Sequence, residues 1–178
     1  LTLGLIVNPY AGLGGTVALK GSDGVDIRSQ AIELGAQSQV EDRVRTALSG
    51  LITDSAEVRL VTYPGIMGEK HCNQLGLTAT VVGSLQSPDT TSEDTQEAVR
   101  LCCQSGVDLL LFAGGDGTAR DVSEVLPEDQ LVLGIPCGVK MQSGVFAVTP
   151  TAVSEVIDTL RQGRIVSAVT ADVRDLDE

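Results

Sequence analysis

Short apolar runs alternate with helix-like segments along most of the chain. The apolar runs are rich in Val, Leu and Ile and are mostly continuous, which is typical of strands covered on both faces of a sheet. They are residues 1–7 (LTLGLIV), 56–63 (AEVRLVTY), 77–83 (LTATVVG), 107–113 (VDLLLFA) and 130–136 (QLVLGIP). We therefore predict a strand in each of these stretches.

Three segments between the strands have helical periodicity or helix-end signals. Residues 40–51 carry apolar side chains at helical spacing, on one face. Residues 90–106 begin with hydroxyl and acidic residues and end at a glycine, with Val99, Cys102 and Cys103 expected to face inward. In residues 149–163, Thr149 is a predicted N-cap followed by a proline. Strands that alternate with helices predict an α/β fold with a largely parallel sheet flanked by helices.

Two segments do not follow this alternation. Residues 11–26 are glycine-rich, and we expect a long ordered loop there. Residues 165–178 alternate apolar and polar side chains like a half-exposed strand, but no partner strand follows them. We interpret residues 1–164 as one α/β domain and residues 165–178 as the start of a second domain that has been cut away.

Composition and charge narrow the class of protein. Only 2% of the residues are aromatic, so the core must be aliphatic. Twelve basic against 24 acidic residues give a net charge of −12, which disfavours nucleic acid and anionic membranes as partners. No run approaches the roughly 18 apolar residues of a membrane span, and residues 1–7 lack the basic flank of a signal peptide. We expect a cytoplasmic protein without membrane or nucleic-acid partners.

The cysteines and the histidine give no catalytic or metal pattern. Cys72, Cys102, Cys103 and Cys137 lack zinc-ligand spacing, and we interpret them as reduced thiols of the core. His71 is the only histidine, and we predict a surface position for it on a polar helix.

The stretch LLLFAGGDGTARDV (109–122) has the clearest chemical signal. Gly114, Gly115 and Gly117 lie between an apolar strand and a predicted helix, at the sheet edge where ligands bind in parallel sheets. Glycines let a ligand approach the backbone closely, and the start of the helix offers free N–H groups to an anion such as phosphate. This spacing predicts a phosphate-binding loop.

Asp116 within this loop has three possible roles. It could ligate the Mg²⁺ that accompanies a nucleoside triphosphate, accept a proton from a hydroxyl that attacks phosphate, or cap the helix. Thr118 and Asp121 fit the spacing of a capping box, although Asp121 could also be a second carboxylate facing the phosphate. Arg120 could pair with phosphate or remain solvated.

Two further glycine-bearing loops follow other predicted strands. Asn8 ends the first strand and precedes Gly12, Gly14 and Gly15. Gly138 and Lys140 follow the strand at 130–136, and the lysine could neutralise phosphate. Because the carboxyl ends of parallel strands meet at one edge of the sheet, we expect these loops to form one shared site.

The motifs taken together resemble those of a known superfamily. GGDGT after an apolar strand is similar to the signature of NAD kinases, diacylglycerol and sphingosine-type lipid kinases and, with small changes, phosphofructokinases. LIVNPYAGLGG, LKGSDG, LLLFAGGDGTARDV and LGIPCGVKMQSGVFA, which lie in this order within residues 3–147, narrow the resemblance. They resemble the ATP-NAD kinase-like family, and within it the branch that includes the protein X of acetoin catabolism.

This resemblance implies a phosphofructokinase-like α/β domain of the NAD kinase N-terminal type. A β-rich C-terminal domain would follow, with the active site between the two domains. Carried over residue by residue, Gly114, Gly115, Gly117 and Thr118 would contact phosphates, Asn8 would line the nucleotide site, and Asp116 would activate or position the acceptor hydroxyl. The chain departs from the resemblance in two places: lipid kinases carry an Asn-Glu pair where this chain has Arg120-Asp121, and the Asn-Glu pair that follows the loop farther along in NAD kinases is not evident here.

The expected function is therefore that of an ATP-NAD kinase-like phosphotransferase. ATP or polyphosphate would be the donor, Mg²⁺ the metal and NAD or another hydroxyl compound the acceptor. A non-catalytic nucleotide-binding regulator is the alternative, and a lipid kinase is a third. The partners expected are small nucleotides and further copies of the chain, as a homo-oligomer. The 178 residues by themselves are expected to have negligible kinase activity.

Overall fold

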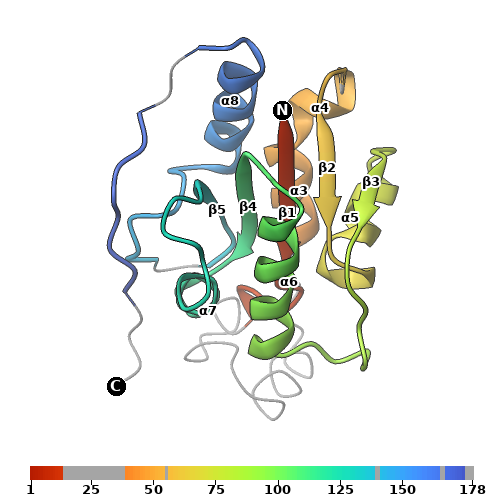
Figure 1. Cartoon of the computed structure of the whole chain (residues 1–178), viewed down its shortest axis with the longest axis vertical. Helices are drawn as coiled ribbons and strands as arrows, with labels where there is room; N and C mark the ends of the chain where they lie inside the picture. Colours follow the sequence, from red (N-terminus) through yellow and green to blue (C-terminus); the bar gives the residue numbers. More distant parts are fainter. Residues whose placement is uncertain (14–38, 55, 139–140, 165–166, 175–178) are drawn as a thin grey trace.

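The structure is a computed structural model of the chain, and it describes residues 1–13, 39–54, 56–138, 141–164 and 167–174. In chain order, its elements are β1 (Thr2–Val7), α3 (Val40–Ala47), α4 (Ser49–Thr53), β2 (Arg59–Thr62), the 3₁₀ helix η1 (Gly65–Met67), α5 (Glu69–Gln74), β3 (Ala79–Val81), α6 (Ser92–Gln104), β4 (Leu109–Gly114), α7 (Asp116–Ser123), β5 (Val132–Pro136) and α8 (Pro150–Arg161). Figure 1 shows these elements on the whole chain.

The strands form one sheet in the order β3-β2-β1-β4-β5, and every neighbouring pair is parallel. This confirms the predicted α/β fold with a largely parallel sheet flanked by helices. Each stretch predicted as a strand contains one of these strands. The strand within 77–83 is the shortest: it covers Ala79–Val81, and Val82 N–H adds one more hydrogen bond to Thr62 O of β2.

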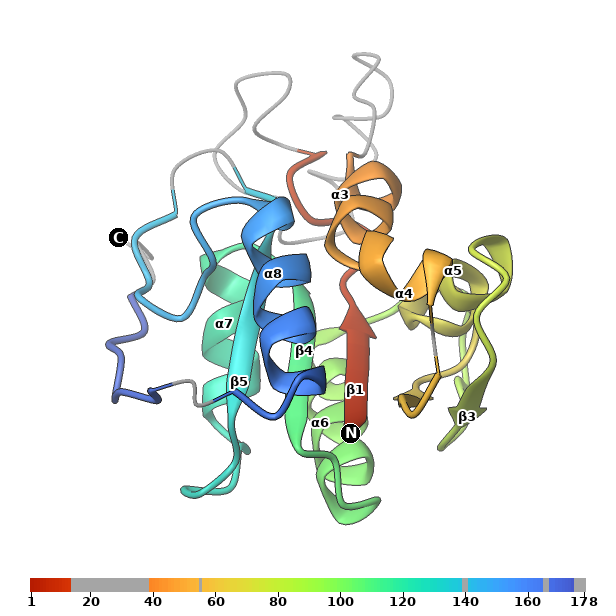
Figure 2. The same cartoon turned by 90° about the horizontal axis from the view of Figure 1, so that it is seen from above.

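Helices cover both faces of the sheet (Figures 1 and 2). On one face lie α3, α4, α5 and α8, and on the other lie α6 and α7. On the outer side of β5, the segment 145–147 adds backbone pairing, since Gly134 N–H donates to Val145 O and Ala147 N–H donates to Gly134 O. The β5 edge of the sheet is therefore partly covered by the chain itself.

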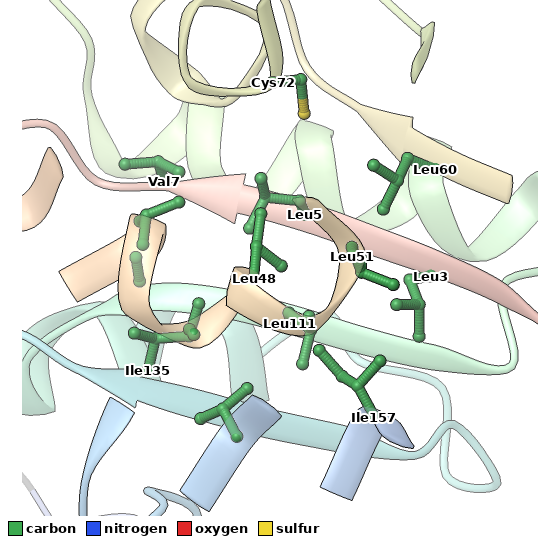
Figure 3. Close-up of a cluster of buried hydrophobic side chains, with 14 of the residues drawn as sticks. Leu3, Leu5, Val7, Leu48, Leu51, Leu60, Cys72, Leu111, Ile135 and Ile157 are labelled. Carbon is green, nitrogen blue, oxygen red and sulfur yellow. The ribbon is translucent and has the colours of Figure 1, made fainter. Parts of the chain in front are cut away.

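Alternation along the central strands divides the apolar side chains between the two faces. Leu3, Leu5 and Val7 of β1 pack into the cluster beneath α3 and α8, whereas Ile6 packs into the cluster beneath α6 and α7. Figure 3 shows the first cluster, with Leu48, between α3 and α4, and Ile157 of α8 lying against the strands. All of these side chains are buried, and full burial of one such side chain stabilises the fold by about 1.5–3 kcal/mol. Burial on both faces explains why these strands are continuous apolar runs.

Helix α6 begins where the sequence predicts. Thr91 is its N-cap and accepts a hydrogen bond from Asp94 N–H, while the Asp94 carboxylate accepts one from Thr91 N–H. This reciprocal capping box satisfies two donors that a helix start leaves free. Val99 and Cys102 are buried as predicted, but Cys103 is only partly buried.

Helix α8 also begins as predicted. Thr149 Oγ1 accepts a hydrogen bond from Ala152 N–H at 3.2 Å, and Pro150 occupies the first helical position. Proline suits this position because its missing N–H would have had no partner in the helix.

The periodic segment 40–51 differs from its prediction as a single helix. It divides into α3 and α4 at Leu48, whose backbone leaves helical geometry. The apolar face is kept across the division, because Val44, Ala47 and Leu51 all remain buried. At the start of α4, Gly50 N–H donates to Ser154 Oγ of α8, so this part of the chain is held against α8.

The stretch 165–178 was predicted as a half-exposed strand, and this is wrong for its described residues 167–174. No strand is assigned there, and the segment passes outside β5 (Figure 1). It is attached instead by a few contacts: Gly144 N–H donates to Asp172 O at 2.9 Å, Arg174 N–H donates to Ser143 Oγ at 3.0 Å, and Val173 packs partly against the core. Of the predicted loop at 11–26, all but residues 11–13 lie outside the described residues.

His71 is buried, at 5% exposure, so its predicted surface position is wrong. It lies on α5, which contacts both β3 and α3, and a short polar helix can still turn one polar residue inward. Burial is the largest influence on the pKa of His71 and lowers it; the Glu41 carboxylate acts in the opposite direction, and Lys70 adds to the lowering. Its Nδ1 has no hydrogen-bond partner among the described residues.

The four cysteines are free thiols, as predicted. Cys72, Cys102 and Cys137 are buried, and burial raises the pKa of these thiols to about 11, 12 and 12 respectively. In the described part of the chain, no helix combines the length and the apolar character needed to cross a membrane.

Candidate functional site

The order of the strands defines a point where the direction of the chain through the sheet reverses. From β1 the chain proceeds to β2 and β3 on one side, and from β4 it proceeds to β5 on the other side. The loops that follow β1 and β4 therefore separate, and ligands of open parallel sheets bind at such a point, outside the carboxyl ends of the strands. Asn8 follows β1 here, and Gly115 and Asp116 follow β4.

Asn8 joins the two loops. Its backbone N–H donates to Ala113 O at 2.9 Å, and its side-chain Nδ2 donates to Thr118 Oγ1 at 2.9 Å. Its Oδ1 accepts a hydrogen bond from Tyr10 N–H at 3.0 Å. The amide group thus fixes the loop after β1 to the first turn of α7.

The glycines at the strand ends differ in the space around them. A Cβ at Gly114 would overlap the side chain of Thr118, and one at Gly12, where φ is +76°, would overlap Cys137 O. Gly114 is therefore needed for the close approach of the first turn of α7 to the end of β4, and Gly12 for packing of the loop after β1 against the end of β5. A Cβ at Gly115 would meet only Gly138 Cα, at 3.9 Å, which is ordinary contact. Packing therefore does not account for the absence of a side chain at Gly115.

Asp116 is the first residue of α7, and its carboxylate is held by the loop after β5. Oδ2 accepts a hydrogen bond from Gln142 N–H at 2.8 Å, and Oδ1 accepts two from Ser143, one from N–H at 2.9 Å and one from Oγ at 2.5 Å. Asp116 does not cap its own helix, because the N-cap is Gly115. The carboxylate instead connects the carboxyl ends of β4 and β5.

The predicted capping box of Thr118 and Asp121 is wrong. Helix α7 already begins at Asp116, so Thr118 lies in the first turn, where it is buried at 4% exposure and accepts the hydrogen bond from Asn8. The error arose because the helix starts three residues earlier than the hydroxyl signal indicates, with Gly115 and not Thr118 as its N-cap.

Arg120 and Asp121 form an ion pair with each other, with Nη2 and Oδ1 3.5 Å apart. The Asp121 side chain is 14% exposed and that of Arg120 is 38% exposed. Gly117 is partly exposed in the first turn of α7, beside Asp116. Of the other predicted site residues, Gly138 lies close to Gly115, whereas Lys140, Gly14 and Gly15 are outside the described residues.

Two further residues at these strand ends were not predicted from the sequence. Ser143 was overlooked, although a hydroxyl residue in the same strand-end loop as Gly138 could have suggested it. Arg43 of α3 donates from Nη1 to Pro136 O at 2.9 Å and from Nη2 to Gln39 Oε1 at 3.0 Å. Arg43 is an interior position of a helix pattern, and nothing in its spacing indicates that it reaches the end of β5.

The described residues do not form a metal cage. No three His, Cys, Asp or Glu side chains are grouped among them in a way that could hold an ion. Mg²⁺ in nucleotide sites is commonly held by one or two carboxylates together with phosphate oxygens and water. The strand-end loops fit an ion of that kind, carried by a nucleotide, with Asp116 as the available carboxylate.

The described residues thus present an α/β domain in which the strand-end glycines and the Asp116 carboxylate meet at the reversal point of a parallel sheet. The model of the ATP-NAD kinase N-terminal domain family matches residues 3–165. The chain belongs to this family, whose members generally use ATP, a divalent metal ion and NAD. Membership of this family supports the prediction that the protein is a transferase of the kinase type and binds nucleotides. No curated protein matched the chain.

Proposed function

We propose that the protein is an ATP-NAD kinase-like phosphotransferase that converts NAD⁺ and ATP to NADP⁺ and ADP, or phosphorylates a related hydroxyl compound. Its strand-end motif GVKMQSG supports the branch of the family that includes the protein X of acetoin catabolism. In this proposal, residues 1–164 form the nucleotide-phosphate domain, and a β-rich domain beginning near residue 165 completes the site.

The observation that carries the proposal is the place of Asp116. It is the one carboxylate at the first turn of α7, directly after the glycines of β4 and beside the loops of β1 and β5. The start of α7 offers backbone N–H groups and the positive end of a helix dipole to the phosphates. A carboxylate beside an anion-binding turn is repulsive to the bound phosphate, which favours a chemical role for it over a purely electrostatic one.

In the proposed reaction, Asp116 accepts the proton of the acceptor hydroxyl. The hydroxyl oxygen forms a bond to the terminal phosphorus of ATP, the bond from that phosphorus to the bridging oxygen breaks, and ADP leaves with the electron pair. Backbone N–H groups at Gly115 and Gly117 stabilise charge on the transferring group. A bound Mg²⁺ would neutralise charge on the phosphate oxygens.

A second candidate is a nucleotide-binding regulator without catalytic activity. The Arg120–Asp121 pair favours it, because the two side chains are paired with each other where lipid kinases of the superfamily carry Asn-Glu. A carboxylate neutralised in this way is less suited to hold a second reactant.

An assay of the full-length protein tests the two candidates. The protein is incubated with Mg-ATP or Mg-polyphosphate and a panel of acceptors that includes NAD, and NADP is measured with a coupled dehydrogenase. Formation of NADP supports the phosphotransferase. Saturable nucleotide binding with no phosphorylated product from any acceptor supports the regulator and contradicts the phosphotransferase.

A further inference from the structure

Ser143 makes contact with the Asp116 carboxylate through both its main chain and its side chain. It lies in the loop after β5 and is 7% exposed. Its N–H donates to Asp116 Oδ1 at 2.9 Å, and its Oγ lies 2.5 Å from the same oxygen, at the short end of the range for a hydroxyl bound to a carboxylate. No other side chain in the described part of the chain makes a hydrogen bond to Asp116.

The proton of the Ser143 hydroxyl has two acceptors within reach. Asp116 Oδ1 is 2.5 Å away, and Arg174 O is 3.1 Å away. The shorter distance and the negative charge of the carboxylate both favour donation to Asp116. Arg174 N–H in turn donates to Ser143 Oγ at 3.0 Å, which occupies a lone pair of the hydroxyl and leaves its proton for Asp116.

The hydrogen bonds use the two carboxylate oxygens unequally. An ionised carboxylate has about four acceptor positions, two on each oxygen. Ser143 fills both positions on Oδ1, whereas Gln142 N–H fills one on Oδ2. Among the described contacts, the remaining acceptor position is therefore on Oδ2.

We propose that Ser143 is the positioning residue for Asp116: it fixes Oδ1 and thereby directs Oδ2 to the acceptor hydroxyl. This inference rests on the proposed phosphotransferase function. It assigns the proton transfer to one oxygen, and it adds to the site a residue that the sequence motifs did not identify. In this proposal Ser143 acts through Asp116, so its loss should slow the chemical step more than it weakens substrate binding.

The test uses steady-state kinetics of the full-length protein with Mg-ATP and NAD. Ser143→Ala should lower kcat by roughly 10- to 100-fold, the scale of a misplaced reacting group, with KM for both substrates within about twofold of the wild type. Ser143→Thr, which keeps the hydroxyl, should restore most of kcat, whereas Ser143→Val, of the same size, should resemble Ser143→Ala. The Thr and Val variants share any cost of the added methyl group, so their difference reports the hydroxyl.

Ser154→Ala is the matched control. Like Ser143, Ser154 is 7% exposed and hydrogen-bonded, but its partners are Ser49 and Gly50 at the contact between α4 and α8. The kcat of Ser154→Ala should therefore equal that of the wild-type protein. If kcat of Ser143→Ala equals that of the wild-type protein, the positioning role is overturned and the proposed function is left intact. The same holds if Ser143→Thr and Ser143→Val have equal kcat values. Absence of phosphoryl transfer by the wild-type protein would overturn the proposed function, and this inference with it.

Discussion

Asn8 Nδ2 donates a hydrogen bond to Thr118 Oγ1 at 2.9 Å, across a sequence separation of 110 residues. The two residues follow β1 and β4, the neighbouring strands at which the chain reverses its direction through the sheet. The contact fixes the first turn of α7 to the loop after β1, and Asp116 lies within that turn. The position of Asp116 therefore depends on a contact that neither loop contains by itself.

Combining Asn8→Ala with Thr118→Val should show coupling between these residues. Each single variant loses the hydrogen bond, so the double variant should be more stable than additivity predicts, by about 0.5–1.5 kcal/mol. The free energy of unfolding of the wild type and the three variants, measured in urea, gives this coupling. Strict additivity of the two changes would show that the contact does not stabilise the site.

Alanine at Gly114 and at Gly115 should have different effects. Gly114→Ala places a Cβ into the Thr118 side chain, and overpacking of this kind costs about 1–3 kcal/mol. Gly115→Ala meets only ordinary contact and should cost about 1 kcal/mol or less, as a change of the N-cap. Thermal and urea unfolding measure both values.

The same pair of variants tests the phosphate role of Gly115. If phosphate approaches the backbone there, Gly115→Ala should weaken binding of Mg-ATP, measured by calorimetry, in a protein that remains folded. Unchanged affinity would remove Gly115 from the phosphate site.

Acidification should destabilise the fold through His71. Burial lowers the pKa of His71 in the folded protein, so the unfolded chain takes up a proton at higher pH than the folded one. The contribution of the neutral side chain is complete above the unfolded pKa of about 6.5 and is lost as the pH falls below it, by at most about 1.4 kcal/mol per pH unit. Glu41 and Lys70 are the charged groups that influence His71.

The glutamine side chain of His71→Gln does not titrate, so this variant should lack the pH-dependent contribution of His71 to stability. Its stability and that of the wild type are compared in urea at pH 7.5, 6.5 and 5.5. The difference between their free energies of unfolding should shrink only below about pH 6.5. Parallel pH profiles would show that His71 is not linked to folding.

Thiol reagents should distinguish Cys103 from the other cysteines. Cys72, Cys102 and Cys137 are buried, and burial raises the pKa of each thiol to about 11 or 12, so the reactive thiolate is scarce at pH 8. Cys103 is partly exposed. In the folded protein Cys103 should react first with Ellman's reagent, and Cys103→Ser should remove this fast phase. A fast phase that survives the substitution would contradict the burial of the other three.

The sequence predicted the sheet well because its strands are buried on both faces. Leu3, Leu5 and Ile6 must all be apolar, since they pack alternately beneath helices on opposite sides. The strand-end loops of β1, β4 and β5 could be located because each of these apolar runs gives way within a few residues to a glycine-bearing segment. The helix starts at Thr91 and Thr149 were predictable for a similar reason, as capping is local.

Contacts between distant segments could not be predicted in this way. Ser143 reaches Asp116 through a loop geometry that its own sequence does not encode, and Gln142 contributes only a backbone N–H. His71 was predicted to be exposed because its neighbours on α5 are polar, yet its side chain is buried in the fold. The missed features thus depend on tertiary packing rather than on local pattern.

The central claim is that Asp116 accepts the proton of the attacking hydroxyl. The most direct test is Asp116→Asn in the full-length protein, with phosphoryl transfer from Mg-ATP to NAD and nucleotide binding both measured. We predict that turnover falls by roughly 10²- to 10⁴-fold, the usual contribution of a general base, while the affinity for nucleotide changes little. Turnover equal to that of the wild-type protein would contradict the claim.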